Sequence, residues 1–496
     1  MGTLRKQTLI SSALVYFGFL VGLINTYFYV RNGSFTQEQF GLTKIFLDFG
    51  QNIYAFSSLG VIPIIYKFYP YYKDNLEEKK IDLVTWAMIT SLVGFVLVMI
   101  AGIYLKPFIV KNYVNTSSLV ADYYYWIFPF ALGILFFSVL ESLCWATQKT
   151  VIPNFLRETF MRLITTAFIL LFYFKVITFS QFIYLFSFLY LLIFFVLLVY
   201  LIRIGKLHFT FKVSRVTKKF FKKIVSMQLL IYSGTWIVSL AGTIDSIVIA
   251  SFTQLGLASV GVFTLAQYIS NLIQVPQRSI QSISAGLLSR AWKDKDMKEI
   301  ERIYSRSSIN LLLMSMFVFG NIWLNIGQGL DILNIQANYK AGLSTLLVLA
   351  CARIIDAGTG VNSLVIGTST FWRFEFFSGI LLLALRLPLT YLLVKHFGIL
   401  GSAFADLSSI IVYNFVRFEF LRRKFGMQPF NLKTVYSILL TVASFAITSL
   451  LLNNVAGWMG MIARGTVFST LMVGGVFLFD LTPDASQLWH KWRGKG

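Results

Sequence analysis

Long apolar stretches separated by short polar connections recur along the whole chain. Each stretch is long enough to cross a hydrocarbon layer of about 30 Å as a helix, which takes roughly 20 residues. The apolar residues are continuous and do not alternate with polar ones, so the pattern predicts helices and not strands. Fourteen membrane-spanning helices are predicted, over residues 8–30, 41–66, 82–105, 122–146, 155–175, 180–202, 225–251, 259–287, 305–327, 341–366, 374–394, 399–420, 433–453 and 459–480.

The composition supports the same fold class. The 496 residues are 57% hydrophobic and only 13% charged, whereas soluble domains carry about 25% charged residues. We therefore predict an all-α integral membrane protein.

Lysine and arginine gather in alternate connections between the predicted helices. If the N-terminus is cytoplasmic, the outer connections hold at most two basic residues each, and the inner connections hold clusters within residues 67–80, 203–223, 290–302, 417–424 and 491–495. This asymmetry follows the positive-inside rule, so both termini are predicted to be cytoplasmic. The net charge of +22 is then mainly a topology signal, and it does not require nucleic-acid binding.

The most basic connection, residues 203–223, has eight lysines and arginines and no acid. We expect it to stop translocation and to contact anionic lipid head groups; a specific docking role is the alternative. It also lies between two halves that a weak internal repeat relates, because a shift of 220 residues superposes Asn25 on Asp245 and Gly41 on Gly261. Parallel repeats of this kind occur in alternating-access transporters. We predict two pseudo-symmetric six-helix lobes, a linker and two C-terminal helices, divided as residues 1–204, 225–424, 205–224 and 425–496.

Charged residues inside predicted spans are the candidates for function. An ionised side chain at a helix centre costs about 2.5–3.5 kcal/mol on insertion scales, so such residues are expected to face protein or a water-filled cavity. The spans contain cations at Lys44, Arg162, Arg278, Arg353 and Arg386 and acids at Asp48, Glu141, Asp245, Asp356 and Asp406.

Two of these charges pair at helical spacing. Lys44 and Asp48 are four residues apart and Arg353 and Asp356 three, so each pair shares a helix face and could neutralise itself during insertion.

Three arginines are predicted without such a partner on the cavity side: Arg162, Arg278 and Arg386. Arg278 follows Pro276 and Arg386 precedes Pro388, at positions where a kink would free backbone groups. A guanidinium offers a planar fork that suits phosphate oxygens, so an anionic substrate could supply the missing partner. The alternative is a salt bridge between helices, with Asp245, Asp356 or Asp406.

Asp245 is the only ionisable residue between Ile224 and Val260. It could pin two helices together, or it could take up a proton or a sodium ion. Asn25, its repeat partner, is polar at the same depth, and Asp48 and Asp356 carry the same two interpretations.

The sequence offers no catalytic or metal-binding pattern. Cys144 and Cys351 lie in separate apolar spans and the three histidines are scattered, so neither a disulfide nor a metal site is predicted. No GxxxxGK[ST] phosphate loop is present, and no cofactor is expected. The DKD string at residues 294–296 matches the DxD pattern of glycosyltransferases, but it sits in a short loop without a catalytic domain.

Three segments resemble a known family: IDSIVIASFTQLGLASVGVFTLAQY (residues 244–268), FTQEQFGLTKIF (residues 35–46) and TQKTVIPNFLRE (residues 147–158). They are similar to polysaccharide flippases of the O-antigen type. These form the polysaccharide-transporter branch of the multidrug/oligosaccharidyl-lipid/polysaccharide (MOP) exporter superfamily, which has a MATE-like fold.

The resemblance implies a transporter and not an enzyme. Such proteins form two six-helix lobes around a cavity lined by helices like spans 1, 2, 7 and 8. They move an undecaprenyl-pyrophosphate-linked oligosaccharide across the bacterial inner membrane by alternating access, alongside other polysaccharide-assembly proteins.

The family's cavity cations map best onto Lys44 and Arg278 of this chain. Arg353 and Arg386 lie on spans further from the expected lining, and span 1 has no cation where some relatives have one. The alternatives are a MATE-like drug or cation antiporter, which should favour cavity acids, and a membrane glycan polymerase or glycosyltransferase.

Overall fold

The computed structural model describes residues 2–114, 118–147 and 149–484, and the predicted basic cluster at 491–495 lies outside them. Helices dominate this described part, which contains no β-strand. Each of the fourteen predicted spans falls in one helix or in a helix that is interrupted once or twice.

Nine helices of the described residues are long and apolar enough to cross a membrane. The chain is therefore a multi-pass membrane protein, and the number of fourteen crossings stays a prediction.

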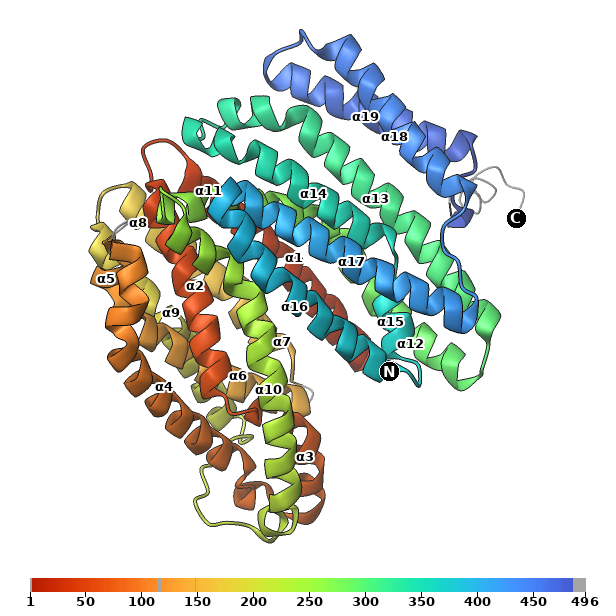
Figure 1. The fold of residues 1–496 in the computed structure, drawn as a ribbon. Helices are drawn as coiled ribbons and strands as arrows, with labels where there is room; N and C mark the ends of the chain where they lie inside the picture. Colours follow the sequence, from red (N-terminus) through yellow and green to blue (C-terminus); the bar gives the residue numbers. More distant parts are fainter. Residues whose placement is uncertain (1, 115–117, 148, 485–496) are drawn as a thin grey trace. The chain divides into compact units, whose positions relative to one another are not determined.

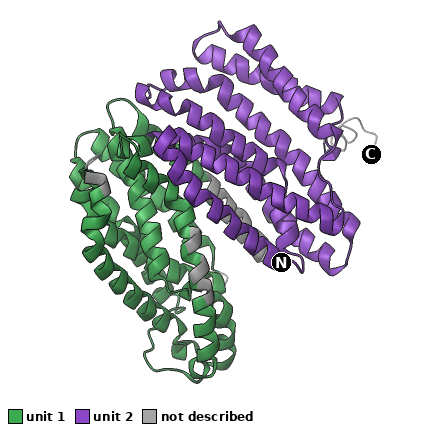
Figure 2. Ribbon diagram, viewed as in Figure 1, with its two compact units in different colours: residues 1–261 green, residues 262–496 purple. Residues whose placement is uncertain are grey.

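The chain forms two compact units, Met1–Gly261 (unit 1) and Val262–Gly496 (unit 2), which Figure 2 colours separately. The division falls inside α11 (Leu257–Asn271). Unit 1 therefore includes α10 (Arg215–Phe252), most of which the predicted lobes assign to the second half. The predicted lobes rest on the internal repeat and not on compactness, and their boundaries stay a prediction.

Unit 1 is built around α6 (Figure 1), which packs against α2, α3, α4 and α9. In the most apolar part of the segment that contains α6, 83% of the residues are buried, as expected for a helix that is apolar on all sides. The elements of unit 1 before α11 are α1 (Gly2–Val30), α2 (Gln37–Ser57), α3 (Val61–Asn75), η1 (Glu78–Lys80), α4 (Leu83–Val114), α5 (Leu119–Tyr123), η2 (Tyr124–Trp126), α6 (Ile127–Ala146), α7 (Val151–Asn154), η3 (Phe155–Phe160), α8 (Met161–Tyr173), α9 (Phe179–Arg203) and α10 (Arg215–Phe252).

Unit 2 places α14 and α16 against α17, while the pair α18 and α19 packs along α13 (Figure 1). After α11 its elements are η4 (Leu272–Gln274), α12 (Val275–Lys293), α13 (Met297–Ile332), η5 (Ala337–Gly342), α14 (Leu343–Gly358), α15 (Asn362–Gly367), α16 (Trp372–Phe397), α17 (Ile399–Phe425), α18 (Leu432–Leu452) and α19 (Gly457–Leu478).

Two glycine sites shape the helices that carry the polar residues of unit 1. Gly60, with a φ of 73°, lies in the break between α2 and α3, in a left-handed conformation that costs glycine little. Gly41 of α2 and Gly261 of α11, which the repeat superposes, allow these two helices to cross closely: a Cβ on Gly41 would collide with the carbonyl of Leu257. The repeat-related glycines therefore pack α11 against α2.

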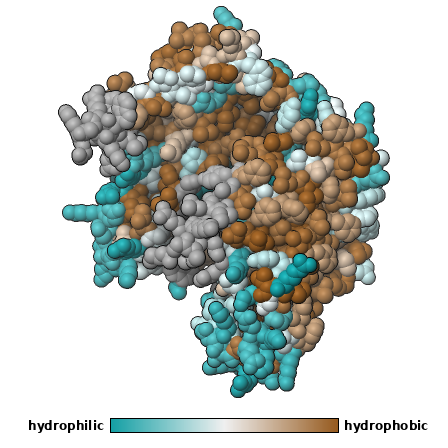
Figure 3. Space-filling model, turned by 180° about the vertical axis from the view of Figure 1, so that it is seen from behind, coloured by the Kyte–Doolittle hydropathy of each residue, from teal (hydrophilic) through white to brown (hydrophobic). Residues whose placement is uncertain are grey.

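The surface shows the membrane-facing and polar regions expected of such a protein. Large apolar side chains are exposed along α4, α9 and α18, for example Leu97, Phe195 and Leu450. Hydrophilic residues gather at the lower end of unit 1 in Figure 3, where α3 ends and α10 begins.

Candidate functional site

A polar seam runs between α2 and α10 inside unit 1. Lys44, Asp48 and Asn52 lie four residues apart on one face of α2. The predicted pair is confirmed, because Lys44 Nζ lies 2.8 Å from Asp48 Oδ1. Asn52 Nδ2 donates to Thr243 Oγ1 of α10 at 2.8 Å, and Ser239 Oγ donates to Asn52 Oδ1 at 2.8 Å. Asn52, Thr243 and Ser239 are uncharged and were not predicted as site residues from the sequence.

Asp245 lies at this seam on α10 and is 3% exposed. It is close enough to Asp48 for the two carboxylates to interact electrostatically. Two buried acids and Lys44 therefore share one region of unit 1.

Asn25 connects α1 to α8. Its Nδ2 donates to the carbonyl oxygen of Arg162 at 2.9 Å, and its Oδ1 accepts from Thr166 Oγ1 at 2.6 Å. The nitrogen and the oxygen of the Asn25 amide both hydrogen-bond to α8, so this side chain holds α1 and α8 together, as the helix-pinning alternative predicts.

Arg162 has an acidic partner that the sequence analysis overlooked. Its Nη2 lies 3.1 Å from Oε2 of Glu158, four residues earlier on the continuous run of η3 and α8. The expectation that Arg162 lacks an acid at helical spacing is wrong, because Glu158 lies one turn earlier on the same helical face.

Unit 2 holds a carboxylate between two arginines. Arg353 Nη2 of α14 donates to Asp406 Oδ2 of α17 at 2.8 Å, and Arg386 Nη1 of α16 lies 3.0 Å from Asp406 Oδ1. The Asp406 side chain is only 1% exposed. The predicted local pair of Arg353 with Asp356 is therefore wrong, and the alternative of a salt bridge between helices is confirmed for Arg386. We refer to these three residues as the Asp406 clamp.

Asp356 instead accepts hydrogen bonds from neutral amides of three elements. Gln274 Nε2 donates to its Oδ2 at 3.0 Å and Gln277 Nε2 at 3.2 Å. Asn414 Nδ2 of α17 donates to Oδ1 at 3.0 Å. These hydrogen bonds surround the half-buried carboxylate without a cation, so Asp356 joins η4, α12 and α14 to α17.

Arg278 differs from the other predicted cations because its side chain is exposed. It makes no hydrogen bond or ion pair with any residue in the described ranges. It lies in the first turn of α12, just after Pro276, where the 3₁₀ turn η4 interrupts the helix. The predicted break at Pro276 is confirmed, whereas α16 continues through Pro388.

No protein-family model matches the chain, and no curated protein matches it by sequence. Solved structures do share its fold. The lipid II flippase MurJ in an inward closed conformation matches with a TM-score of 0.73 and 14% identity, over 95% of this chain and 98% of that chain.

Two states of a multidrug resistance MATE family transporter of the MOP superfamily also match, both at 15% identity. The inward-facing structure has a TM-score of 0.64 over 84% of this chain and 98% of its own. The outward-facing structure has a TM-score of 0.56 over 85% of this chain and 96% of its own. The chain shares the fold of these transporters.

Further cations with partners inside the fold were not identified from the sequence, among them Arg157, Arg464 and the buried Arg417, which pairs with Glu375. Arg157 Nη1 lies 2.7 Å from Oε2 of Glu141 and joins η3 to α6. Arg464 is 4% exposed in α19 and donates to Asn325 and Gln328 of α13. Arg157 lies near the edge of a predicted span, and Arg464 has only amide and carbonyl partners, which give no charge pattern.

The described residues contain no group of three or more histidine, cysteine or acidic side chains that could hold a metal ion. Cys144 is buried and Cys351 half-buried, and both are free thiols. The polar side chains described above mainly hold neighbouring helices together, and those in the described ranges form no cluster of metal-ligating groups.

Proposed function

We propose that the chain is a flippase that moves an undecaprenyl-pyrophosphate-linked oligosaccharide from the cytoplasmic to the outer leaflet of a bacterial inner membrane. Transport would proceed by alternating access and supply surface-polysaccharide synthesis. The fold likeness to a lipid II flippase and the resemblance of the three sequence segments support this proposal. A pyrophosphate cannot enter hydrocarbon without a replacement for its hydration, so such a carrier needs polar groups within the membrane.

The observation that carries the proposal is the state of Arg278. Arg353 and Arg386 already neutralise Asp406, and Arg162 is paired with Glu158, so each would have to leave an acid before it could bind phosphate. Arg278 is exposed and makes no ion pair with the described residues. Its guanidinium can therefore form charge-assisted, bidentate hydrogen bonds to a phosphate.

Lys44 is the second phosphate contact in this proposal. Its side chain is 14% exposed and its ammonium is paired with Asp48, so we expect Lys44 to contribute less than Arg278. Arg162, Arg353 and Arg386 are assigned a structural role.

Replacing Arg278 by alanine tests the proposal directly. We expect transport of a lipid-linked oligosaccharide into proteoliposomes to fall roughly tenfold or more, because hydrogen bonds to charged groups contribute about 1.5–3 kcal/mol. The thermal midpoint should change little, since Arg278 is exposed and makes no hydrogen bond or ion pair with the described residues. Lys44→Ala should have a smaller effect on transport.

Arg290→Ala is the matched control. Arg290 is an exposed arginine on the same helix, 3.7 Å from Asp294 in an inner turn, and its loss should leave transport unchanged. Wild-type transport by Arg278→Ala would refute the assignment of Arg278 as the phosphate ligand.

For energy coupling we propose Asp48 and Asp245. Both carboxylates are buried in the same region of unit 1, where a bound cation would offset their charge. Asp245→Asn should then give folded protein whose transport depends differently on pH or sodium. Loss of folded protein instead would assign Asp245 to helix pinning.

A MATE-like drug or cation antiporter is the second candidate, and the buried acids Asp48 and Asp245 favour it. Such a protein would extrude a cationic dye from cells, and Asp48→Asn would abolish this while Arg278→Ala would not. The two candidates therefore predict opposite sensitivities of these two residues.

A further inference from the structure

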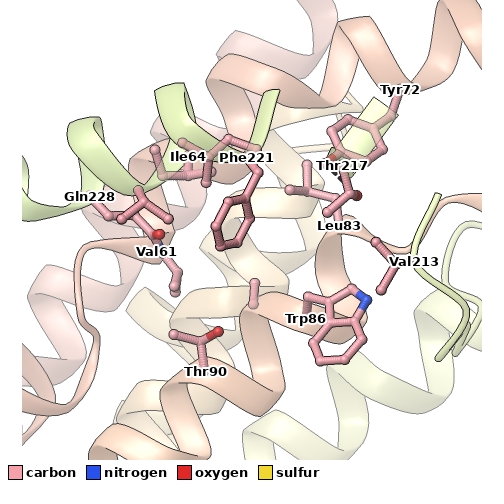
Figure 4. Close-up of a pocket in the computed structure, with 13 residues that line it drawn as sticks. Val61, Ile64, Tyr72, Leu83, Trp86, Thr90, Val213, Thr217, Phe221 and Gln228 are labelled. Atoms are coloured by element: carbon pink, nitrogen blue, oxygen red, sulfur yellow. Dashed lines mark hydrogen bonds between the residues drawn. The ribbon is translucent and has the colours of Figure 1, made fainter. Parts of the chain in front are cut away.

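An apolar cavity of about 240 Å³ lies within unit 1, where α3, α4 and the first turns of α10 meet (Figure 4). Ile64 of α3, Trp86 and Thr90 of α4, and Phe221 of α10 contribute to its wall. It is formed by unit 1 alone and involves none of the charged residues discussed above.

The polar groups at one end of the cavity are bonded to each other. The hydroxyl groups of Tyr72 and Thr217 lie 2.8 Å apart, and Thr217 Oγ1 donates to Asp82 Oδ2 at 2.8 Å. The backbone N–H of Ser214 donates to the same oxygen at 2.8 Å. These bonds fix the start of α10 to the start of α4, and they leave a wall that is mainly hydrocarbon. A hydrocarbon chain fits such a space better than a polar ligand does.

The rim of the cavity is apolar and open. Val213, Phe221 and Val225 line the cavity and are 40%, 60% and 36% exposed. Leu229, one turn further along α10, is 66% exposed and extends this apolar rim. An occupant can therefore enter from the surface of unit 1, and covering these side chains would favour its binding.

Lysines flank the cavity on the same helix. Lys218 directly follows the lining residue Thr217, and Lys222 directly follows the lining residue Phe221. Each lysine therefore lies about 100° around α10 from a residue of the cavity wall. Both lysines are exposed, and neither forms an ion pair within the described part of the chain. Residues 203–223 contain no acid that could neutralise them. An apolar opening bordered by unneutralised ammonium groups suits a ligand with an anionic head and a hydrocarbon tail.

We propose that this cavity binds one anionic glycerophospholipid of the cytoplasmic leaflet. One acyl chain fills the space between α3, α4 and α10, and the phosphate group lies beside Lys218 and Lys222. The site is separate from the proposed substrate contacts at Arg278 and Lys44, and it does not depend on the proposed function. The proposed site is one specific place where residues 203–223, which are expected to contact anionic head groups, would bind a lipid.

Trp86 provides a reporter inside the cavity. The full chain, purified in detergent, is titrated with phosphatidylglycerol whose acyl chains carry bromine, which quenches tryptophan fluorescence on contact. The chain has ten tryptophans, so the signal of Trp86 is the difference between the wild type and Trp86→Phe. We expect a saturable quenching of Trp86 by brominated phosphatidylglycerol, and weaker quenching by brominated phosphatidylcholine.

The double variant Lys218→Gln, Lys222→Gln tests the head-group contact. It should weaken the phosphatidylglycerol titration roughly tenfold, because each lysine near an anionic head group contributes to binding. It should leave the phosphatidylcholine titration unchanged. The control is Lys293→Gln, Lys298→Gln, which removes two exposed lysines from another inner turn and should leave both titrations as in the wild type.

Three results would overturn the proposal. Brominated phosphatidylglycerol could fail to quench Trp86 at any concentration, which would show that no acyl chain enters the cavity. The two lipids could quench Trp86 equally, with no effect of the lysine variant, which would show a site without head-group selectivity. Finally, a polyprenyl phosphate could displace the brominated lipid more readily than unbrominated phosphatidylglycerol does, which would assign the cavity to the tail of a carrier lipid.

Discussion

The buried charges of the two units are neutralised in different ways. In unit 1, Lys44 pairs with Asp48 and Arg162 with Glu158, four residues away along continuous helix. In unit 2, Asp406 is held by arginines from two other helices. A pair within one helix forms as soon as that helix does, whereas a clamp between helices exists only in the packed unit. We therefore expect breaking the Asp406 clamp to cost more stability than breaking either of these two pairs of unit 1. The pair of Arg157 with Glu141, which joins η3 to α6, is the exception in unit 1.

The largest effect is expected for Asp406→Asn. This change leaves Arg353 and Arg386 in a site where they are only 12% and 16% exposed, without their shared acid. Removing one partner of a buried ion pair costs about 3–5 kcal/mol. The yield of folded protein and its thermal midpoint in detergent should both fall strongly.

The triple variant Arg353→Met, Arg386→Met, Asp406→Leu separates lost charge balance from lost packing. Apolar residues of similar size can replace a buried ionic cluster at little cost, so this variant should recover most of the midpoint. A midpoint as low as that of Asp406→Asn would show that the hydrogen-bond geometry of the clamp, and not the unpaired cations, governs stability.

A smaller loss is expected for Lys44→Met in unit 1. It leaves Asp48, which is 5% exposed, without its ammonium partner. An unsatisfied buried polar group costs about 1–3 kcal/mol. Unfolding of the single variants and of Lys44→Met, Asp48→Leu gives the coupling energy of the pair. A coupling energy of zero would contradict the 2.8 Å contact as a stabilising interaction.

Glu158→Gln should matter less again. The two side chains of its pair with Arg162 are 27% and 32% exposed, and exposed pairs contribute less than about 1 kcal/mol. We expect the thermal midpoint of Glu158→Gln to shift very little. Glu141→Gln is the contrasting variant and should lower the midpoint more, because Glu141 is 4% exposed and binds Arg157. Equal losses in both variants would mean that exposure does not set the size of the effect.

The smallest effect concerns Asp484, which follows the last helix and contacts α13. Hydrogen bonds from Arg306, and then from Asn310, hold the pKa of the Asp484 carboxyl below its ordinary value. A lowered pKa in the folded state means that this contact stabilises fully above the ordinary value of about 4 and weakens as the pH falls further.

The difference in thermal midpoint between the wild type and Asp484→Asn should therefore be constant from neutral pH to about pH 5 and shrink below about pH 4. A difference that shrinks already near pH 6 would show that another group titrates. Arg302→Gln, which removes a neighbouring exposed arginine paired with Glu299, serves as a control and should not change this acid dependence.

The sequence predicts the helices well because a membrane imposes one simple requirement on each of them. Every backbone group in hydrocarbon must be paired within its segment, so long apolar runs become helices. The interruption before Pro276 could also be foreseen, since proline lacks the N–H that a continuous helix needs. The break at Gly60 had no such signal in the apolar pattern.

The candidate site was less predictable. The pair of Lys44 with Asp48 follows from spacing alone, and Glu158 could have been found in the same way. Asp406, in contrast, lies 53 residues from Arg353, and only the packing of α14 on α17 brings them together. The exposure of Arg278 depends equally on tertiary structure, because its sequence neighbourhood resembles that of Arg386.

The Asp406 clamp also has a consequence for biogenesis. Translation delivers Arg353 and Arg386 before Asp406, so two cations reach the insertion machinery while their counter-charge has not yet been synthesised. Until α17 arrives, α14 and α16 carry uncompensated charge that disfavours release into lipid. These three helices should therefore leave the translocon as a group, whereas α2, with its own counter-ion, can partition alone.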